Sequence, residues 1–490
     1  MARTARPPII AVMGHIDHGK SSLLDYIRKA NVCASEAGGI TQHVSAYVAE
    51  HAGRRVTFLD TPGHEAFQAL RARGARSADI AILVVAADEG VMPQTLDALA
   101  SIKEARIPYI VAITKIDKNN ADIERAKTSL LEHEVFLEGL GGDIAYAPVS
   151  SKTGEGVDEL LDLVLLAADL ADIAADPEAG TTGFVLESTQ DQKRGSSATL
   201  VVRDGTLHLG GFVVAGDAYA PVRFIEDFLG KRIEQADPSE PVRISGFSKL
   251  PAAGSLFSVV ATKKEAEALA REHATEHAKV AERGIMAEGI TELPIVIKAD
   301  AAGSVDAIVH ELAKVTHERG VVSVIASGVG SVSESDVKVA HAASGIIIAF
   351  NVGTDLIARD LADRDGVPIH TFSIIYELSE KVAELLSERI PSIDVEQELG
   401  RAKVLKPFSS SAKKQVLGAR YISGTLALGA RVKVLRGGGE EVARGSITNL
   451  QQARADVNVI KTEGDFGIEI ECRTPLAYGD ELVAFTVEKA

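Results

Sequence analysis

The stretch from Gly14 to Ser21, GHIDHGKS, has residue types and a spacing that suit phosphate binding. It matches the pattern GxxxxGK[ST], follows the apolar run IIAVM and precedes the helical segment SSLLDYIRKA. The two glycines let the backbone wrap closely, so that successive N–H groups point at phosphate oxygens, and Lys20 can meet the β and γ oxygens. Ser21 can supply a hydroxyl to Mg²⁺. The predicted phosphate-binding residues are Gly14, His15, Ile16, Asp17, His18, Gly19, Lys20 and Ser21.

A second motif, DTPG, follows the strand-like run RVTFLD. The carboxyl ends of parallel strands meet at one edge of a sheet, so we expect Asp60 beside the phosphates, where it can hold Mg²⁺ through a water molecule. The N–H of Gly63 can meet the γ-phosphate. Read alone, DxxG is a common turn, and only its pairing with the first motif indicates a triphosphatase switch. The predicted residues are Asp60, Thr61, Pro62 and Gly63.

A third motif, TKID, ends the apolar run YIVAITK. One carboxylate at Asp117 can accept both N1–H and N2–H₂ of guanine, whereas adenine offers no such donor pair, so this residue favours GTP over ATP. By itself the pattern also fits a surface ion pair, and the later SSK also fits an ordinary turn. The predicted base-binding residues are Thr114, Lys115, Asp117, Ser150, Ser151 and Lys152.

The elements that must position these motifs alternate between strand-like and helical segments, which predicts a multidomain α/β plus β fold. Further along, short strands with Gly or Pro turns indicate barrels, and one more α/β stretch separates them. We expect a P-loop GTPase domain at 1–175, a β-barrel at 181–262, a helical connector at 263–290, a second α/β (αβα) domain at 291–377, a connecting helix at 378–394, and a C-terminal β-barrel at 395–490.

The composition excludes several classes of protein. The chain has 490 residues and a net charge of −17, so its surface as a whole repels nucleic-acid backbones, although a local basic patch can still bind RNA. Two cysteines form no disulfide framework, and no apolar run approaches the roughly 18 residues of a membrane helix. With no tryptophan and 4% aromatic residues, an aromatic base-stacking platform is disfavoured. We expect a cytoplasmic monomer that binds neither membranes nor DNA.

The motifs GHIDHGKS, GGITQH, DTPGH and TKID, in this order, resemble those of the translational GTPases. GGITQHVSAY, KADAAGSVDAI, SGVGSVSESDV and IHTFSIIYEL are similar to the bacterial initiation factor 2 family, so the resemblance covers nearly the whole chain. It implies a ribosome-stimulated GTPase that delivers initiator formylmethionyl-tRNA to the small ribosomal subunit and promotes subunit joining. The implied partners are both ribosomal subunits, their rRNA and this tRNA, and the implied cofactors are GTP or GDP with Mg²⁺.

The resemblance also assigns residue roles. Thr41 matches the switch threonine that completes the Mg²⁺ shell with Ser21 and Asp60, and His64 stands where the family positions the attacking water. Withholding one positioning group can slow phosphoryl transfer by orders of magnitude, so we expect slow intrinsic hydrolysis. In the last barrel, the residues that match the family's initiator-tRNA pocket are Phe408, Gly418, Ala419, Asp465 and Phe466.

Three departures from the family pattern qualify these expectations. Thr114 replaces the usual asparagine of NKID, which predicts weaker guanine binding with unchanged base choice. Only thirteen residues precede Gly14, so we expect the long N-terminal extension of bacterial members to be absent. Ala419 and Phe466 replace two cysteines that are usual in the tRNA pocket, although Phe466 equally fits a side chain that fills the barrel core.

Two other functions remain open at this stage. One is a GTP-dependent ribosome- or RNA-binding factor with altered or lost specificity for initiator tRNA, which the changes at Ala419 and Phe466 motivate. Residues 395–490 contain 14 Lys and Arg against 12 Asp and Glu, a balance that agrees only weakly with RNA contact. The other is a nucleotide kinase or metabolic ATPase, which shares the phosphate loop but neither TKID nor the barrels.

Overall fold

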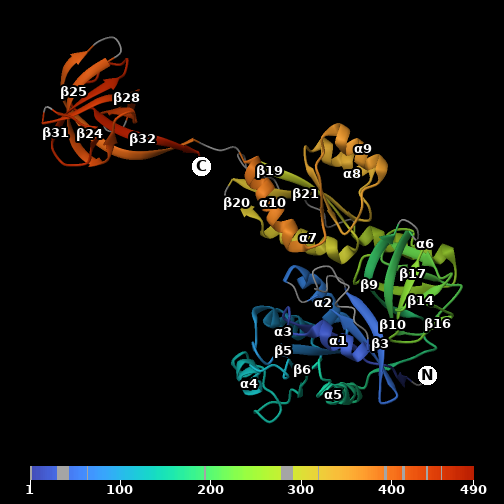
Figure 1. Cartoon of the computed structure of the whole chain (residues 1–490). Helices are drawn as coiled ribbons and strands as arrows, with labels where there is room; N and C mark the ends of the chain where they lie inside the picture. Colours follow the sequence, from blue (N-terminus) through green and yellow to red (C-terminus); the bar gives the residue numbers. More distant parts are fainter. Residues whose placement is uncertain are drawn as a thin grey trace. The chain divides into compact units, whose positions relative to one another are not determined.

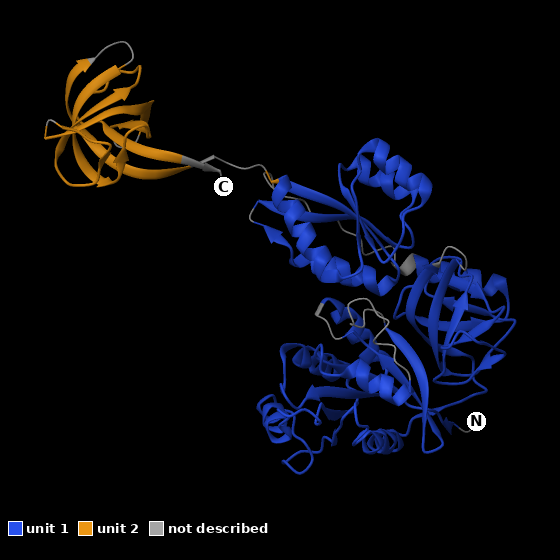
Figure 2. Cartoon of the chain, in the orientation of Figure 1, with its two compact units in different colours: residues 1–389 blue, residues 390–490 orange. Residues whose placement is uncertain are grey.

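The computed structural model describes residues 3–29, 44–62, 65–191, 195–277, 291–317, 319–390, 394–410, 414–437, 440–453 and 455–489. The chain divides into a first unit of residues 1–389 and a second unit of residues 390–490 (Figure 2). The first unit contains two α/β sheets and a β-barrel, and the second is a β-barrel with its own core (Figure 1).

A six-stranded sheet carries the predicted nucleotide motifs. Its strands, in the order in which they pair, are β3 (Ser45–His51), β4 (Arg54–Asp60), β2 (Ile9–Gly14), β5 (Ile80–Ala86), β6 (Tyr109–Thr114) and β7 (Tyr146–Pro148). Only β3 runs antiparallel to its neighbour. Strands β2 and β5 are buried along their whole length, as expected for unbroken apolar strands in a sheet that is covered on both faces.

Helices cover the two faces of this sheet. On one face, α1 (Lys20–Arg28) and α5 (Val157–Leu170) contribute Leu23 and Leu160 to a core that includes Val12 of β2. On the other face lie α2 (Gln68–Ser77) and α3 (Pro93–Ala105), because Met13, the neighbour of Val12, points toward Gly74 of α2. Helix α4 (Ile123–Glu132) follows the TKID motif, and the short 3-10 helix η3 (Glu65–Phe67) precedes α2.

The barrel of the first unit is built from an eight-stranded sheet and a two-stranded ribbon. The sheet strands, in pairing order, are β13 (Ala218–Pro221), β12 (Phe212–Ala215), β18 (Leu256–Val260), β9 (Thr182–Asp191), β10 (Gly195–Asp204), β17 (Pro241–Ser245), β14 (Ile225–Asp227) and β15 (Arg232–Ile233); the ribbon pairs β11 (Leu207–His208) with β16 (Gln235–Ala236). Buried polar contacts join the barrel to the nucleotide domain: Arg6 pairs with Asp79 at 2.6 Å and donates to the Ser239 hydroxyl, and Thr57 donates to the Ser239 carbonyl at 2.6 Å. At the same junction, β1 (Thr4–Ala5) pairs with β8 (Ala174–Ala175).

The charged segment that we expected to be a connector begins as helix α6 (Lys263–His277), which packs on this barrel. Ala266 and Ala270 are buried against Val214 of β12, and Tyr219 donates to Glu267 at 2.9 Å. Leu269 is the only large aliphatic residue of this helix, which is why the sequence pattern did not predict the contact. The contact forms because small alanine side chains let the helix approach the sheet closely. The rest of the expected connector, residues 278–290, lies outside the described residues.

The second α/β sheet has five strands: β20 (Thr316–His317), β21 (Gly320–Val329), β19 (Thr291–Ala299), β22 (Ile346–Phe350) and β23 (Ile369–Phe372), in pairing order. Two helices contact one face and two the other. These pairs are α7 (Ala302–Lys314) with α10 (Ile375–Arg389), and α8 (Glu334–Ala342) with α9 (Leu356–Asp365). Helix α10, expected from residue 378 as a connection, starts at Ile375 and buries Leu378, Val382 and Leu386, so it is a layer of this domain.

In the second unit, six strands form a closed ring. They are β27 (Arg431–Arg436), β32 (Glu481–Lys489), β24 (Asp394–Ser410), β25 (Lys414–Gly424), β31 (Asp465–Glu471) and β28 (Glu440–Gln452), and the ring closes because β27 also pairs with β28. Strand β29 (Ala455–Asp456) pairs antiparallel with the end of β28, and β26 (Leu426–Ala427) pairs with β30 (Val459–Ile460). A closed ring leaves no long sheet edge open to other chains.

The predicted fold class, α/β domains combined with β-barrels, is therefore confirmed. Within the described ranges, every helix is too short or too polar to traverse a lipid bilayer.

Candidate functional site

The predicted phosphate loop connects β2 to α1, and its two glycines have the conformations that the motif requires. Gly14 has a φ of 148°, and a Cβ there would lie 2.4 Å from the carbonyl oxygen of Val84 on β5. Gly19 has a φ of 86° and caps the N-terminus of α1. Lys20 is 6% exposed, and its ammonium donates to the carbonyl of His15 across the loop. The loop thus combines a helix N-terminus and one lysine, which together attract phosphate.

The two histidines of the loop do not add positive charge at neutral pH. His18 is fully buried, and burial together with the nearby His15 ring lowers the pKa of His18 to about 4. Its Nδ1 accepts the Ala86 N–H at 3.3 Å, and its Nε2 lies 3.5 Å from the carboxylate of Glu89. Burial, with a smaller effect of Lys20, also lowers the pKa of His15. His18 therefore attaches the loop to the end of β5 and does not face the phosphates as a cation.

The TKID and SSK motifs meet at a cavity of about 290 Å³ at the carboxyl edge of the sheet. Asp117 lies in this cavity and accepts a hydrogen bond from Ser150 at 2.8 Å, which fixes the carboxylate. Lys115, with a φ of 60°, pairs with Glu89 at 3.2 Å. The described lining residues are Asp17, Gly19, Ser22, Thr114, Lys115, Asp117, Lys118, Ser151 and Lys152, so the cavity joins residues from all three predicted base and loop segments.

The side chain of Thr114 connects the base-binding strand to the phosphate loop, although the family pattern NKID has an asparagine amide at this position. Its hydroxyl is buried and donates to the carbonyl of His18 at 2.5 Å, so the base-binding strand is tied to the phosphate loop. A second, longer contact at 3.4 Å reaches the carbonyl of Val85. A hydroxyl is thus long enough to bridge the two motifs here, although it offers fewer hydrogen bonds than an asparagine side chain.

Asp60 is the last residue of β4 and lies beside Val12 of β2, the strand that leads into the phosphate loop. Thr61 is fully buried and donates to the carbonyl of Val12 at 2.8 Å, so its hydroxyl anchors the strand end. The carbonyl of Pro62 accepts from Arg71 of α2 at 3.4 Å. The three other predicted switch residues, Thr41, Gly63 and His64, lie outside the described residues.

The donor chemistry at this edge fits the expected Mg²⁺. Ser21 is in the first turn of α1, and Asp60 ends the strand adjacent to β2. A hydroxyl and a carboxylate are hard oxygen donors, and Mg²⁺ in nucleotide sites takes few protein ligands together with phosphate oxygens and water. Ser21 and Asp60 would hold the ion, which would neutralise charge on the phosphates when bound.

Sequence reasoning missed two residues that support the site. Gln94 of α3 accepts the Ile16 N–H at 3.0 Å and so fixes the middle of the phosphate loop. Glu89 contacts both His18 and Lys115 and so connects two motifs. Neither residue belongs to a motif, and each contact joins segments that are distant along the chain. The only available signal was that both residues follow the carboxyl end of the apolar strand β5.

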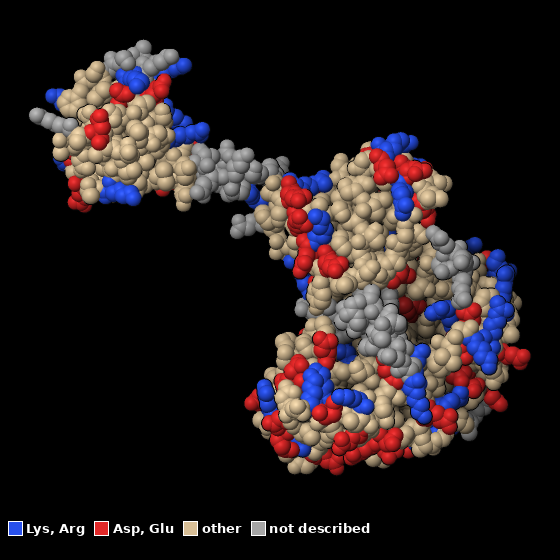
Figure 3. Space-filling view, in the orientation of Figure 1, with Lys and Arg blue, Asp and Glu red and all other residues tan. Residues whose placement is uncertain are grey.

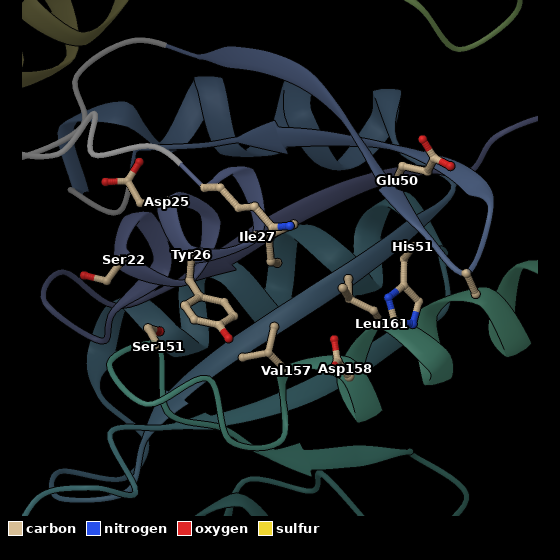
Figure 4. A pocket seen from close by; sticks show the side chains of 12 residues that line it. Ser22, Asp25, Tyr26, Ile27, Glu50, His51, Ser151, Val157, Asp158 and Leu161 are labelled. Atoms are coloured by element: carbon tan, nitrogen blue, oxygen red, sulfur yellow. The ribbon is translucent and has the colours of Figure 1, made fainter.

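A larger hollow of about 980 Å³ lies beside the base cavity and shares Ser22 and Ser151 with it. Figure 4 shows its lining: Tyr26 and Asp25 come from α1, Glu50 and His51 from β3, and Val157, Asp158 and Leu161 from α5. Neither Lys20 nor Asp117 is among the described residues that line it. Although this hollow is larger than the base cavity, it lacks the residues expected to bind the phosphates and the guanine, so we do not assign the nucleotide to it.

The predicted tRNA-binding residues divide into two groups on the C-terminal barrel. Ala419 and Phe466 are register partners on β25 and β31, and they are 0% and 5% exposed, so their side chains fill the core. Their neighbours Gly418 and Gly467 also pair, and these face outward because side chains alternate along a strand. A Cβ on Gly418 would lie 2.9 Å from the ring of Phe408, which is 67% exposed. On the same strands, Asp465 forms a two-bond ion pair with Arg420.

Three family models match the chain in sequence order. The Elongation factor Tu GTP binding domain matches residues 6–169, Elongation factor G domain 2 matches residues 180–260, and Translation-initiation factor 2 matches residues 266–383. The solved structure of GDP-bound aIF5B from Aeropyrum pernix is 27% identical, with a TM-score of 0.50, and the match covers 98% of this chain and 92% of that one.

Several curated relatives named Translation initiation factor IF-2 match almost the whole chain. The relative from Lachnoclostridium phytofermentans is 42% identical over 95% of this chain and 42% of its own length, and that from Carboxydothermus hydrogenoformans is 43% identical over 99% and 60%. The chain thus spans less than two thirds of these two proteins. The relative from Rubrobacter xylanophilus is 43% identical over 98% of this chain and 71% of its own length. By this similarity, the chain belongs to the bacterial translation initiation factor 2 family.

Proposed function

We propose that the chain binds GTP at the carboxyl edge of its first sheet and hydrolyses it to GDP and phosphate. The observation that carries this proposal is the cavity of about 290 Å³ that is lined both by Asp117 and by Gly19, the N-cap of the phosphate-binding helix. Ser150 fixes the Asp117 carboxylate as an acceptor, which suits the two donors on the guanine edge and rejects adenine. Thr114 and His18 couple this base site to the phosphate loop.

For hydrolysis, we propose the roles that the family resemblance assigns. Lys20 and the N-terminus of α1 hold the phosphates, while Ser21, Thr41 and Asp60 hold Mg²⁺. His64 positions the attacking water, and the Gly63 N–H meets the γ-phosphate. The buried, neutral His18 is unsuited to this catalytic role because its ring is packed against β5.

We propose that the C-terminal barrel binds initiator formylmethionyl-tRNA, and that the whole chain delivers this tRNA to the small ribosomal subunit and promotes joining of the large one. Phe408, Gly418 and Asp465 lie on one outward face and suit contact with a ligand, with Gly467 as their neighbour. Ala419 and Phe466 support this face from the core. Because their side chains point inward, their difference from the family pattern removes no side chain from the face, which favours this function over the alternative of lost initiator specificity.

Filter binding of formylated and unformylated initiator tRNA tests the tRNA assignment. We expect the GTP-bound chain to retain the formylated form more tightly, and equal affinity for the two forms would reject the assignment. Competition of GTP and ATP for the nucleotide site tests the first step, and equal competition would instead favour a metabolic ATPase. We further propose that the working protein is a cytoplasmic monomer that contacts both ribosomal subunits and their rRNA.

A further inference from the structure

A second cavity of the first unit, about 490 Å³ in volume, lies between α2 and the barrel strands β9, β10 and β18. It shares none of its described lining residues with the cavity that contains Asp117. One wall is a single face of α2, because its lining residues are spaced three, four and seven positions apart along the helix. The other wall is formed by residues of the first unit's β-barrel. The described lining residues are Ala69, Ala72, Arg73, Arg76, Ser77, Phe184, Arg203, Ala253, Gly254 and Leu256.

Three arginines line this cavity, and none of its described lining residues is acidic. Each arginine has a carboxylate partner outside the lining: Arg73 pairs with Asp306 at 3.0 Å, Arg76 with Glu104 at 2.5 Å, and Arg203 with Asp79 at 3.7 Å. A guanidinium has five N–H donors, so one carboxylate leaves most of them available. The three carboxylates lie outside the lining, so they do not fill the space between the arginines.

Arg73 is the most enclosed of the three cations. Its side chain is 17% exposed, and its Nη1 is buried without a hydrogen-bond partner among the described residues. Gly254 lies directly against it, because a Cβ on that glycine would be 2.9 Å from Arg73 Nε. A buried donor without a partner costs free energy, and a rotation of the guanidinium toward the cavity would let an anionic ligand satisfy it.

We propose that this cavity binds a small organic phosphate, whose phosphate group contacts Arg73, Arg76 and Arg203. Arginine forks match phosphate oxygens, and a phosphomonoester carries close to two negative charges, which suits several guanidinium groups. The buried Phe184 and the 75% exposed Leu256 offer an apolar surface for the rest of such a molecule. The cavity volume lies in the range of small-molecule sites.

The observations favour a small ligand over an RNA strand. The chain carries a net charge of −17, and the face of the first unit in Figure 3 has Asp and Glu side chains along its lower margin. An extended polyanion would be repelled by this excess of negative charge over its length, whereas a single phosphate would meet mainly the three arginines.

Cytidine monophosphate is the probe that tests this site, because a pyrimidine cannot satisfy the proposed guanine contacts of Asp117. Equilibrium dialysis would use the full chain saturated with GDP, so that the nucleotide site is filled. We expect saturable binding of one molecule, weakened roughly tenfold by Arg203→Ser and by Arg76→Ser. Both side chains are partly exposed, at 44% and 66%, so these variants are expected to fold, and their GDP affinity checks this.

Arg364→Ser is the matched control. Arg364 is 72% exposed, pairs with the carboxylate of Asp365, and lies on α9, which contributes no residue to the described lining of the cavity. We expect it to leave binding unchanged. Absence of saturable binding, or binding that neither cavity variant weakens, would overturn the proposal. Binding of a cytidine hexanucleotide that both variants weaken, without binding of the monophosphate, would assign the cavity to RNA and also overturn it.

Discussion

The nucleotide site and the outward face of the C-terminal barrel hold their polar groups in different ways. At the nucleotide site, Thr114, Ser150 and His18 are fully or almost fully buried and hydrogen-bonded to neighbouring motifs. On the barrel face, Arg420 and Asp465 pair with each other at the surface, with side chains 61% and 58% exposed. Buried, connected groups are already oriented for a ligand, whereas exposed ion pairs contribute little energy and rearrange easily. Single substitutions should therefore have larger effects at the first site than at the second.

His64→Ala tests the nucleotide site most severely. We expect GTP affinity to stay near normal and ribosome-stimulated turnover to fall by about a thousandfold or more, because the imidazole is proposed to position water and not the nucleotide. Single-turnover hydrolysis with and without ribosomes measures this. Turnover close to the normal rate would exclude His64 from the proposed role. His51→Ala, which removes a histidine that pairs with Asp162, is the control.

Asp117→Asn should come next in size. The amide offers donors where the carboxylate only accepts, so we expect guanine nucleotides to bind about a thousandfold more weakly and xanthine nucleotides to bind better. Competition between GDP and xanthosine diphosphate measures the change. Asp122→Asn, which alters the N-cap of α4 in the same loop, should preserve guanine preference. An unchanged preference in Asp117→Asn would contradict the base assignment.

Acid should weaken the first unit through its buried histidine. The pKa of His18 in the folded chain, about 4, lies below its ordinary value of 6.5. The unfolded chain therefore takes up this proton first, so the stabilisation is complete above pH 6.5 and is lost as the pH falls from 6.5 to 4. We expect this group to lower the free energy of unfolding by up to about 3 kcal/mol across that window.

Denaturant unfolding at several pH values measures this loss. His18→Gln should show a smaller fall between pH 6.5 and 4 than the unaltered chain. Residues 390–490 contain no histidine, so the barrel provides an internal comparison. An equal fall in the variant and the unaltered chain would mean that His18 is not its cause.

Thr114→Val isolates the connection between the base site and the phosphate loop. The substitution keeps the shape of the side chain and leaves the buried carbonyl of His18 without its 2.5 Å donor. A lost buried hydrogen bond of this kind predicts about tenfold weaker binding of GDP and GTP alike, with base preference unchanged. Thr114→Ser should retain most of the affinity. Nucleotide binding as tight in Thr114→Val as in the unaltered chain would show that the bridge is dispensable.

Phe408→Ala should have the smallest effect. The ring is 67% exposed and rests beside Gly418, so its loss removes apolar contact area and breaks no buried network. We expect formylated initiator tRNA to bind about three- to fivefold more weakly, with GTP binding unchanged. Filter binding measures this, with Val459→Ala as the control. A hundredfold or greater loss of affinity for this tRNA would mean that the barrel face is as preorganised as the nucleotide site, and would contradict the difference drawn between the two sites.

The nucleotide motifs were readable from sequence because each is a short local pattern placed at the end of a strand. The contacts that orient them were not, since Gln94 and Glu89 join segments that meet only in the folded sheet. In the barrel, the inward orientation of Ala419 and Phe466 depends on the strand register, and bulges such as the one between Val404 and Lys406 shift that register. Sequence alone therefore left both interpretations of Phe466 open.

The ring of the C-terminal barrel begins and ends in adjacent strands, because Asp394 of β24 pairs with Lys489 of β32. The first and last strands of the barrel consequently meet at one end of it, and the boundary between the two units lies near residue 390, just before β24. A module with its own core that is joined to the first unit outside its strands can be separated from that unit without opening its sheet. Proteolytic cleavage at that boundary should release a folded fragment of about a hundred residues that melts independently of the remainder.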